Sequence, residues 1–448
     1  MTQKEALDIL KLGHNVFLTG AAGSGKTYLL NQYIDYLKKN DVEVGITAST
    51  GIAATHMNGK TIHSWAHINI KEELTPADLS YIYDRLDWRV AFLQTKVLII
   101  DEVSMLHHYR LDMVNQVLQK IHQNSLPFGD IQVILCGDLF QLPPVMRNGQ
   151  LPKYVTDSKV WESMNIKVCY LTEQYRQDDK DFLRLLNEMR GNNVSNESLL
   201  KLYARLNKDV DSDITPTKLY THNVDVDAIN NFELAALKTK DHLYEMTYRG
   251  EEHLVKALRE SCLAPNELHI KEGAVVMFVQ NNFGAGYVNG TLGIVTGFTK
   301  QDNFPIVKTL SGKTITAYPA TWHVDEGRVI IAEINQVPLR LAWAITVHKS
   351  QGMTLDVAQI DLGKAFVEGM GYVALSRVKS LQGIKLLGMN DKALKVEPRV
   401  IAIDEKLQEF SDQAISELAN INHKQLKKLQ KEYLNRITAT YETAELFD

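Results

Sequence analysis

Short apolar runs rich in β-branched residues alternate with amphipathic stretches through the first half of the chain. Runs that are apolar at successive positions are typical of strands buried on both faces, as in a parallel sheet covered by helices. Strands are expected at 15–19, 42–47, 96–100, 132–136 and 168–171, with helices between them. The pattern predicts a doubly wound α/β domain.

The second half changes character twice. A new strand series begins at 217–223, and from about 241 to 339 short strands follow one another at Gly and Asn turns. Such closely spaced strands predict a small β-barrel inserted into a second domain. The α/β pattern returns with "RLAWAITVHKSQG" and "VAQIDL". The overall fold class is therefore α/β, with two parallel-sheet domains.

Polar segments divide these regions. Residues 66–95 form a polar insert with no strand of their own, and "RGNNVSNES" is the best candidate linker. We expect a first domain at 1–195, a second at 205–400 and a charged helical tail at 401–448. The tail places four apolar side chains on one helical face: Leu426, Leu429, Tyr433 and Ile437.

Length and composition are those of a soluble globular protein of two or three domains. The chain has 448 residues, 45% hydrophobic and 23% charged, and no apolar run approaches the roughly 20 residues that span a bilayer. Its first residues do not resemble a secretory signal, and its three isolated cysteines suit a reducing compartment and a buried position. A net charge of −5 argues against a broad basic surface but not against a local basic groove.

The stretch "GAAGSGKT" follows the first predicted strand and opens a helix, which is the context that gives the pattern GxxxxGK[ST] its meaning. Glycines let backbone amides approach phosphate oxygens, and the helix offers its positive end. Lys26 reaches the β- and γ-phosphates. The expected nucleotide-binding residues are Gly23, Ser24, Gly25, Lys26 and Thr27.

"VLIIDE" supplies the second half of a nucleotide site. Asp101 and Glu102 emerge at the end of a buried strand. The aspartate can hold magnesium together with the Thr27 hydroxyl, and the glutamate can orient or deprotonate a water molecule. The two motifs together predict binding and hydrolysis of ATP with Mg²⁺.

Three further polar residues indicate a motor rather than a nucleotide kinase. Gln141 in "CGDLFQLPPV" is suited to sensing a γ-phosphate, and "LTEQYRQ" and "YVALSRV" present Arg176 and Arg377. Taken alone, each arginine is most simply a surface ion-pair partner. Two arginines on distant segments meet one triphosphate only if two domains close over it, which makes closure depend on the γ-phosphate.

These motifs, in this order, resemble the Pif (petite-integration-frequency) family of superfamily-one DNA helicases. The resemblance spans residues 3–387 and includes "TASTGIAATHMNGKTIHSWAHI", "PFGDIQ", "VNGTLGIV" and "AITVHKSQGMTLD". It implies two RecA-like domains with ATP between them, a small wedge at 66–95 and the inserted barrel. It also implies that Gln3 reads adenine, and that Gln141, Arg176 and Arg377 contact the γ-phosphate.

The activity implied by the resemblance is ATP-driven translocation along single-stranded DNA from 5′ to 3′, with unwinding of duplexes and single-strand/double-strand junctions. A monomeric, cytoplasmic or nucleoid-associated motor is expected, and a preference for G-quadruplex DNA is left open. The DNA contacts expected from the motifs are Thr50, His63, Asn223, His348, Lys349 and Ser350. Trp65 is either a stacking face for bases or part of the core.

Other interpretations remain at this point. The segment "EGMG" places Met370 where the family commonly has glutamine, which puts one polar contact in doubt. A RecD-like motor subunit would need a larger complex, and a translocase that strips proteins from DNA would unwind little. A P-loop kinase or regulatory ATPase would hydrolyse ATP without regard to DNA. His63 and His67 stand four residues apart, but "HSWAH" lacks the glutamate of a zinc protease helix.

Overall fold

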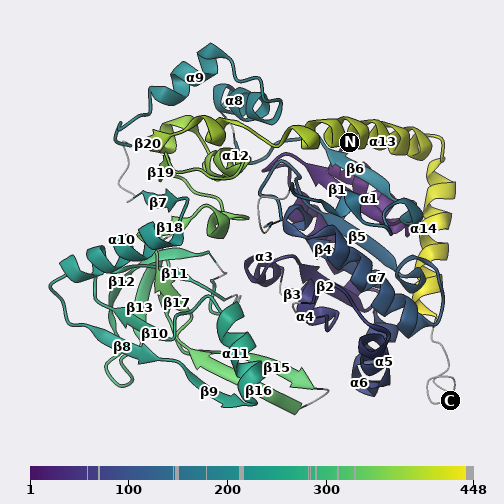
Figure 1. Cartoon of the computed structure of the whole chain (residues 1–448), viewed down its shortest axis with the longest axis horizontal. Helices are drawn as coiled ribbons and strands as arrows, with labels where there is room; N and C mark the ends of the chain where they lie inside the picture. The colour runs from purple at the N-terminus through teal and green to yellow at the C-terminus, as the bar shows by residue number, and fades with distance from the viewer. Residues whose placement is uncertain are drawn as a thin grey trace. The chain divides into compact units, whose positions relative to one another are not determined.

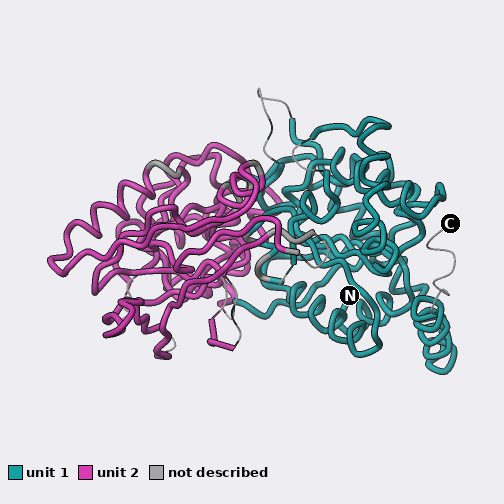
Figure 2. Tube along the Cα trace, turned by 90° about the horizontal axis from the view of Figure 1, so that it is seen from below, with its two compact units in different colours: residues 1–177, 396–448 teal, residues 178–395 magenta. Residues whose placement is uncertain are grey.

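Residues 1–177 and 396–448 form one unit of the computed structural model and residues 178–395 form a second; we call them unit 1 and unit 2 (Figure 2). The structure describes residues 1–57, 59–68, 71–144, 146, 151–177, 179–210, 216–280, 282, 284–287, 290–309, 312–326 and 329–439. Each unit is considered by itself.

Unit 1 is built on a sheet whose six described strands are all parallel, in the order β3-β2-β4-β5-β1-β6. This confirms the predicted doubly wound α/β fold. The strands are β1 (Val16–Gly20), β2 (Val44–Ala48), β3 (Lys60–Thr61), β4 (Val97–Asp101), β5 (Gln132–Cys136) and β6 (Lys167–Leu171).

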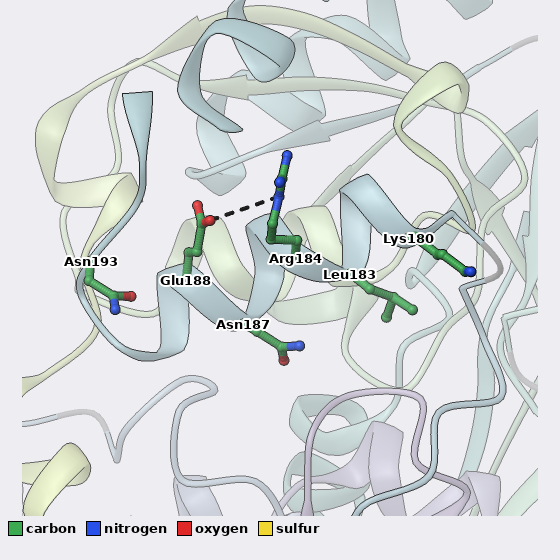
Figure 3. A pocket seen from close by; sticks show the side chains of 6 residues that line it. All are labelled: Lys180, Leu183, Arg184, Asn187, Glu188 and Asn193. Atoms are coloured by element: carbon green, nitrogen blue, oxygen red, sulfur yellow. Dashed lines mark ion pairs between the residues drawn. The ribbon is translucent and has the colours of Figure 1, made fainter. Parts of the chain in front are cut away.

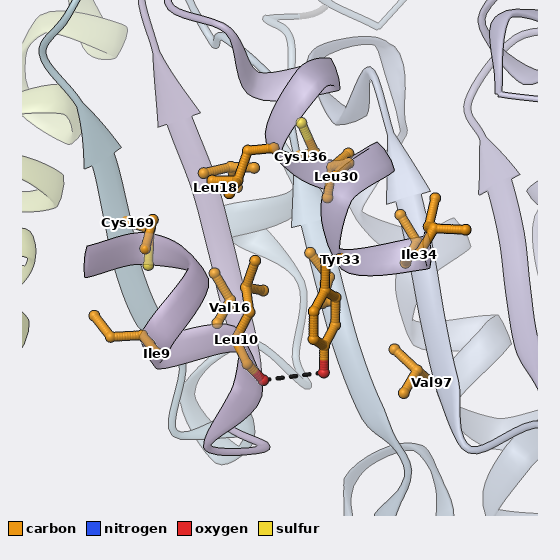
Figure 4. Close-up of a cluster of buried hydrophobic side chains, with 14 of the residues drawn as sticks. Ile9, Leu10, Val16, Leu18, Leu30, Tyr33, Ile34, Val97, Cys136 and Cys169 are labelled. Carbon is orange, nitrogen blue, oxygen red and sulfur yellow. Dashed lines mark hydrogen bonds between the residues drawn. The ribbon is translucent and has the colours of Figure 1, made fainter. Parts of the chain in front are cut away.

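Alternate strand residues face opposite sides of this sheet, so an apolar run can fill two cores. Val16 and Leu18 join the core shown in Figure 4, whereas Phe17 between them is buried on the other side, edge-on to Trp161. Residues of the first two helices, among them Leu10 and Tyr33, complete the core of Figure 4. Burial on both faces explains why the strands read as continuous apolar runs.

Helices surround the sheet of unit 1 (Figure 1). The α-helices are α1 (Gln3–Lys11), α2 (Lys26–Lys38), α3 (Gly51–His56), α4 (Ile62–Trp65), α5 (Pro76–Asp84), α6 (Leu86–Gln94), α7 (His108–His122), α13 (Pro398–Ala419) and α14 (His423–Thr438). The short 3₁₀ helices are η1 (Val103–Met105), η2 (Pro127–Asp130), η3 (Val155–Asp157) and η4 (Glu162–Met164). Helices α5 and α6 fall in the expected wedge segment 66–95, and both pack on α7.

The C-terminal helices α13 and α14 pack against α1 and β6 of unit 1, rather than forming a separate tail (Figure 1). The contact of α14 with the core of unit 1 includes hydrogen bonds to the side chain of Gln132. Its Oε1 accepts hydrogen bonds from the hydroxyls of Tyr33 at 2.8 Å and Tyr433 at 3.0 Å, and its Nε2 donates to the carbonyls of Leu10 at 2.9 Å and His14 at 2.7 Å. A buried amide with every polar atom satisfied holds its neighbours in one arrangement.

Unit 2 contains a second parallel sheet in the order β18-β7-β19-β20, in agreement with the predicted second α/β domain. Its strands are β7 (Thr217–Tyr220), β18 (Ala344–Thr346), β19 (Ala358–Leu362) and β20 (Ile384–Met389). The helices of unit 2 are α8 (Lys180–Arg190), α9 (Asn196–Tyr203), α10 (Asn223–Ala236), α11 (Glu252–Ser261), α12 (Met370–Ser376), η5 (His348–Ser350), η6 (Leu381–Gly383) and η7 (Asp391–Leu394).

The boundary between the units lies after Gln177, whereas we expected the first domain to extend to 195. The reason is that α8 packs on α12 and therefore belongs to unit 2. The polar stretch at 190–198 that we expected as a linker connects α8 to α9 within unit 2.

The insert of unit 2 is rich in antiparallel strands, as its turns predict. One sheet has the order β14-β13-β12-β11-β17, a second pairs β10 with β8, and a third has the order β15-β16-β9. The small β-barrel expected for this insert stays a prediction. The strands are β8 (His242–Glu245), β9 (Thr247–Gly250), β10 (Glu267–Ile270), β11 (Val275–Phe278), β12 (Leu292–Phe298), β13 (Pro305–Thr309), β14 (Thr314–Thr316), β15 (Ala320–Glu326), β16 (Val329–Gln336) and β17 (Leu339–Leu341).

Two expectations from composition concern single features. Cys136 and Cys169 are buried and Cys262 is half-buried, and all three are free thiols. Within the described ranges, none of the helices combines the length and the apolar character that crossing a membrane requires.

Candidate nucleotide and DNA sites

The phosphate loop connects β1 to α2 and depends on two glycines with left-handed backbones. Gly23 has φ +89° and Gly25 has φ +83°, a conformation that side chains other than glycine rarely adopt. A Cβ atom on Gly23 would lie 2.7 Å from the Cβ of Arg176, and one on Gly25 would lie 2.1 Å from Nε2 of Gln3. Glycine therefore lets two other segments approach the loop closely.

Lys26 is the first residue of α2 and lies over the loop that precedes it. Its ammonium donates hydrogen bonds to the carbonyls of Gly20 at 2.8 Å and Ala21 at 3.0 Å. The hydroxyl of Ser24 is buried and has no hydrogen-bond partner among the described residues. A buried donor without a partner fits a site that is completed by a bound group. Thr27 is exposed on the first turn of α2.

Asp101 and Glu102 follow β4 at the same edge of the sheet. Asp101 is buried, and its Oδ1 accepts the backbone N–H of Glu102 at 2.8 Å. Burial raises the pKa of Asp101, while hydrogen bonds from the Cys136 thiol and the Glu102 amide and the charge of Lys26 lower it. A carboxylate at which burial disfavours the anion is well suited to a divalent cation, which would favour the anion again.

Glu102 has φ +52° and ψ +44°, a left-handed conformation that costs energy for a residue with a side chain. Its carbonyl accepts a hydrogen bond from the Ser49 hydroxyl at 2.6 Å, which helps to hold this conformation. Strain of this kind persists where the surroundings impose it, and it is frequent at active sites. The chain therefore turns sharply at the residue predicted to activate water.

The turn after β5 contributes Gln141. Because β5 lies between β4 and β1 in the sheet, the chain that leaves it emerges between the carboxylates and the phosphate loop. Asp138 and Gln141 are both buried, and Asp138 organises the turn by accepting the N–H of Phe140 at 3.2 Å on its carboxylate and that of Gln141 at 3.0 Å on its carbonyl.

Arg176 is brought to the phosphate loop by the segment after β6. The backbone N–H of Tyr175 donates to the carbonyl of Gly23 at 2.9 Å, and the close approach at Gly23 places the half-buried Arg176 against the loop. Gln3 approaches from α1, with Nε2 donating to the carbonyl of Gly25 at 3.4 Å. Unit 1 thus gathers most of the predicted ATP-site residues at the carboxyl ends of β1, β4, β5 and β6, the edge where parallel sheets bind ligands.

Arg377 lies in unit 2, at the C-terminal end of α12. Its side chain is buried, with Nε donating to the carbonyl of Val373 at 3.0 Å and Nη2 to the hydroxyl of Ser376 at 3.1 Å. Its contact with a nucleotide held by unit 1 stays a prediction.

The residues predicted to contact DNA in unit 1 lie after β2 and β3. Thr50 precedes α3, and its hydroxyl accepts the N–H of Ala53 at 3.3 Å. Burial, with the charges of Arg110 and His107, lowers the pKa of His63 to about 4, so its imidazole is neutral near pH 7. Trp65 packs edge-on against Phe92 at 5.0 Å, and its ring lies against Gly45. Of the two alternatives for Trp65, these contacts favour the core.

In unit 2, His348, Lys349 and Ser350 form η5, directly after β18. Burial lowers the pKa of both His348 and Lys349. The buried hydroxyl of Ser350 donates to the carbonyl of Val347 at 2.7 Å. Asn223 begins α10, and its side chain lies outside the described part of the structure.

Phe366 is a residue that the sequence motifs did not single out. Its ring is 46% exposed and lies 4.9 Å from the ring of His222 and 6.2 Å from that of His348. An exposed aromatic face beside a polar loop is the kind of surface on which nucleobases stack. A lone Phe between "LGKA" and "VEG" carries no signal of its own, and its neighbours become visible only in the fold.

A hollow of about 490 Å³ on unit 2 does not include any of these residues (Figure 3). It is lined by Lys180, Leu183, Arg184, Asn187, Glu188 and Asn193, all on α8 or just after it. The hollow belongs to unit 2, whereas the phosphate loop belongs to unit 1.

Comparison with known proteins gives a consistent family. Residues 2–198 match the family model of PIF1-like helicase, and residues 253–298 match that of the DNA helicase Pif1 2B domain. ATP-dependent DNA helicase Pif1 of Psychrobacter sp. (strain PRwf-1) is 43% identical, over 97% of this chain and 75% of that protein.

Solved structures agree. The crystal structure of Pif1 helicase from Candida albicans matches with a TM-score of 0.81 and 31% identity, over 90% of this chain and 98% of that one. Pif1 helicase from Bacteroides in complex with ADP-AlF3 and single-stranded DNA matches with a TM-score of 0.68 and 29% identity, over 91% and 96%. A further match, with a TM-score of 0.67, 30% identity and the same coverage, concerns unwinding at forked double-stranded DNA by two coordinating Pif1 helicases. The chain therefore belongs to the PIF1-like family of ATP-dependent DNA helicases.

Proposed function

We propose that this protein uses ATP to move from 5′ to 3′ along single-stranded DNA and to separate the duplex that it meets. The observation that carries the ATP-dependent part is the arrangement in unit 1. The phosphate loop, Asp101 with Glu102, and Gln141 lie at one edge of one parallel sheet, and Arg176 and Gln3 lie against the loop. The 5′-to-3′ direction rests on the family resemblance.

Each residue has a physical role in this proposal. Backbone amides of the loop and Lys26 bind the phosphates, and Gln3 selects adenine. Asp101 and Thr27 would hold Mg²⁺, which neutralises charge on the phosphates when it is bound. Glu102 orients the attacking water and accepts its proton, and Gln141 and Arg176 bind the γ-phosphate oxygens.

Arg377 is proposed to complete the site from unit 2. An arginine that reaches the transferred phosphate stabilises the charge of the transition state, which is worth about 10³–10⁵ in rate. Because Arg377 and the phosphate loop belong to different units, its arrival requires the units to close on ATP and hydrolysis releases them. This cycle of closure and release supplies the movement that drives translocation.

DNA contacts on both units turn that movement into translocation. Thr50 and His63 belong to unit 1, and Asn223, His348, Lys349 and Ser350 belong to unit 2, so the two sets can hold the strand alternately. The neutral imidazole of His63 favours a hydrogen bond or a stacking contact over a charge interaction. We extend this set to Phe366, whose exposed ring offers a stacking face.

The wedge favours a helicase over a translocase that unwinds little. Helices α5 and α6 form and pack on α7, so the segment that we propose as the wedge is folded, which supports duplex separation. We propose that the single chain is sufficient as a motor, that its substrates are single strands and junctions, G-quadruplex DNA among them, and that it works in the cytoplasm or on the nucleoid.

The decisive experiment is strand displacement by the purified protein with ATP and magnesium on two partial duplexes, one with a 5′ tail and one with a 3′ tail. Displacement of the 5′-tailed substrate alone is expected, with Lys26→Ala as the inactive control. Displacement of the 3′-tailed substrate alone would overturn the polarity. DNA-stimulated hydrolysis with no displacement would favour a translocase or a subunit that needs a partner, and light scattering during the assay would give the oligomeric state.

A further inference from the structure

Helix α8 is tied at its N-terminus to the segment that follows Arg377. The carboxylate of Asp179 uses its two oxygens for two different elements. Oδ1 caps α8 by accepting the N–H groups of Asp181 and Phe182, both at 3.1 Å, and Oδ2 accepts the N–H of Leu381 at 3.2 Å. Leu381 is buried and begins η6, four positions after Arg377. One side chain therefore joins the start of α8 to the exit of α12.

The C-terminus of α8 is tied to α12 itself. Nη1 of Arg190 donates to the hydroxyl of Tyr372 at 3.1 Å, and its guanidinium lies 5.6 Å from the centre of that ring. Both side chains are buried, at 8% and 1% exposed. Next to Tyr372, a Cβ on Gly371 would come within 1.9 Å of the carbonyl of Ala393. Helix α12 therefore also packs closely against η7, which contains Ala393. Helix α8 is thereby tied at both ends, to η6 through Asp179 and to α12 through Arg190.

Only the buried side of α8 makes these ties. Its opposite side carries Arg184, which pairs with Glu188 at 4.0 Å (Figure 3) and with Glu197 at 2.5 Å, in side chains that are 41%, 19% and 59% exposed. Exposed pairs of this kind contribute little. Asp179 and Arg190 therefore add specific hydrogen bonds to the packing of α8 on α12.

Chain continuity gives this connection a direction. Tyr175 bonds to the phosphate loop at Gly23, Gln177 is the last residue of unit 1, and α8 begins at Lys180. Tyr175 and the first residue of α8 are therefore five positions apart in the sequence. The backbone of Arg377 is braced as well, because its carbonyl accepts the N–H of Leu355 at 2.8 Å.

We propose that Asp179 is a positioning residue for Arg377. By capping α8 and holding Leu381 with the same carboxylate, it fixes the segment that leaves Arg377 to the start of α8. This inference rests on the proposed role of Arg377 in ATP hydrolysis. Asp179 itself touches no substrate; its effect is on where the guanidinium arrives when ATP is bound.

Asp179→Asn separates its two roles. The asparagine keeps one oxygen to cap α8, and Asn caps helices as well as Asp does. The side-chain NH2 of the asparagine would then face the backbone N–H of Leu381, and two donors cannot form a hydrogen bond. The bond to η6 is therefore lost, while the side chain keeps its size and shape. The expected result is a fall in kcat for DNA-stimulated ATP hydrolysis of between about tenfold and about a hundredfold, as for a displaced catalytic group, with KM for ATP changed by less than about twofold.

The test is a cycle of Asp179→Asn, Arg377→Ala and the double variant, with Ser195→Ala as the matched control. Ser195 caps α9 in the same unit through the N–H of Ser198, and its hydroxyl donates to the carboxylate of Glu188 on α8 at 3.0 Å; within the described residues no hydrogen bond joins it to η6. If Asp179 acts through Arg377, the double variant has the kcat of Arg377→Ala, and Ser195→Ala has normal kcat. Urea unfolding of each variant identifies loss of folding.

Two results would overturn the inference. One is a normal kcat for Asp179→Asn while Arg377→Ala is impaired. The other is a full additional loss in the double variant, which would mean that Asp179 acts independently of Arg377. A normal kcat for Arg377→Ala alone would instead remove Arg377 from the proposed catalytic site, so failure of the inference and failure of the proposed function are distinguished.

Discussion

The side-chain amide of Gln3 donates a hydrogen bond to the backbone carbonyl of Gly25, 3.4 Å away, and a Cβ atom on that glycine would collide with the amide at 2.1 Å. The first turn of α1 is thus fitted to the phosphate loop. Thr2 and Glu5 cap this turn reciprocally, with the Thr2 N–H donating to the Glu5 carboxylate at 2.8 Å. This position beside the loop supports the proposed role of Gln3 in reading adenine.

Gln3→Ala is expected to raise KM for ATP by about tenfold and to narrow the preference for ATP over GTP, because one hydrogen bond to the base is lost while the phosphate contacts remain. Steady-state hydrolysis with both nucleotides measures this. Lys4→Ala, exposed on the same helix, is the matched control. An unchanged ATP-to-GTP ratio in Gln3→Ala would remove adenine recognition from this residue.

Glu102→Gln is expected to bind ATP and DNA normally and to lower kcat by two orders of magnitude or more, in line with the roughly 10²–10⁴-fold contribution of a general base. Glu102→Gly adds a structural comparison. Because Glu102 has φ +52°, glycine removes the cost of a left-handed residue, so this variant is expected to be no less stable than the parent while remaining inactive. Near-normal turnover in Glu102→Gln would exclude the base role.

Stability of unit 1 is expected to fall as the pH drops from about 6.5 to about 4. Burial, with the charges of Lys60 and Arg85, lowers the pKa of His67 to about 4, whereas the unfolded chain protonates it near 6.5. Between these two pKa values the unfolded state binds more protons than the folded state. The contribution of neutral His67 to the free energy of unfolding is therefore complete above about pH 6.5 and is lost on acidification. His63, which is half-buried, adds a pKa shift of the same sign.

His67→Asn tests this dependence, because asparagine tolerates the left-handed backbone of His67 (φ +53°) and does not titrate. The variant loses the stack of His67 on Trp88, whose rings lie 3.6 Å apart, and is expected to be less stable near pH 7. Urea unfolding near pH 7 and pH 5 should show a smaller loss between the two conditions than in the parent. Equal losses would mean that His67 does not titrate as stated.

Gln132 is expected to be the most sensitive of the contacts that hold the C-terminal helices. Tyr433→Phe removes one hydrogen bond and leaves Gln132 Oε1 bonded to Tyr33, for a cost of about 1 kcal/mol. Gln132→Leu leaves the Tyr433 hydroxyl and the His14 carbonyl without this amide, whereas the Tyr33 hydroxyl keeps the Leu10 carbonyl as its partner at 3.0 Å, and the expected cost is about 2 kcal/mol or more. If urea unfolding shows the same loss of stability for both variants, Gln132 does not join several of these groups as described.

The sequence predicted local structure well where the apolar pattern is unambiguous. The strand expected at 132–136 is β5 with the same bounds, and β1 and β4 differ from expectation by one residue at each end. The order of strands could not be predicted, because pairing joins segments far apart in the chain. That β5 separates Gly20 from Asp101 in the sheet is a property of the fold alone.

The segments against which each helix packs could likewise not be predicted from the sequence. The predicted apolar face of α14 is confirmed, because Leu426 and Tyr433 are buried. The surface on which this face packs includes Gly13, where a Cβ would lie 2.2 Å from the Tyr433 ring. Nothing in a lone glycine near the start of a chain points to a helix more than four hundred positions later. The unit boundary was misplaced for a related reason, since a glycine turn looks the same within a domain as between two.

The return of α13 and α14 to unit 1 has a consequence for biosynthesis. A ribosome completes the phosphate loop early, but residues 396–439, which cover α1 and β6, leave it only after all of unit 2 has been made. Until then the apolar side chains that contact Ala414, Leu434 and Ile437 face solvent in the nascent chain. Chaperone binding to this surface should therefore persist until synthesis is nearly finished, and a product truncated before residue 396 should be open to proteolysis at its nucleotide-binding unit.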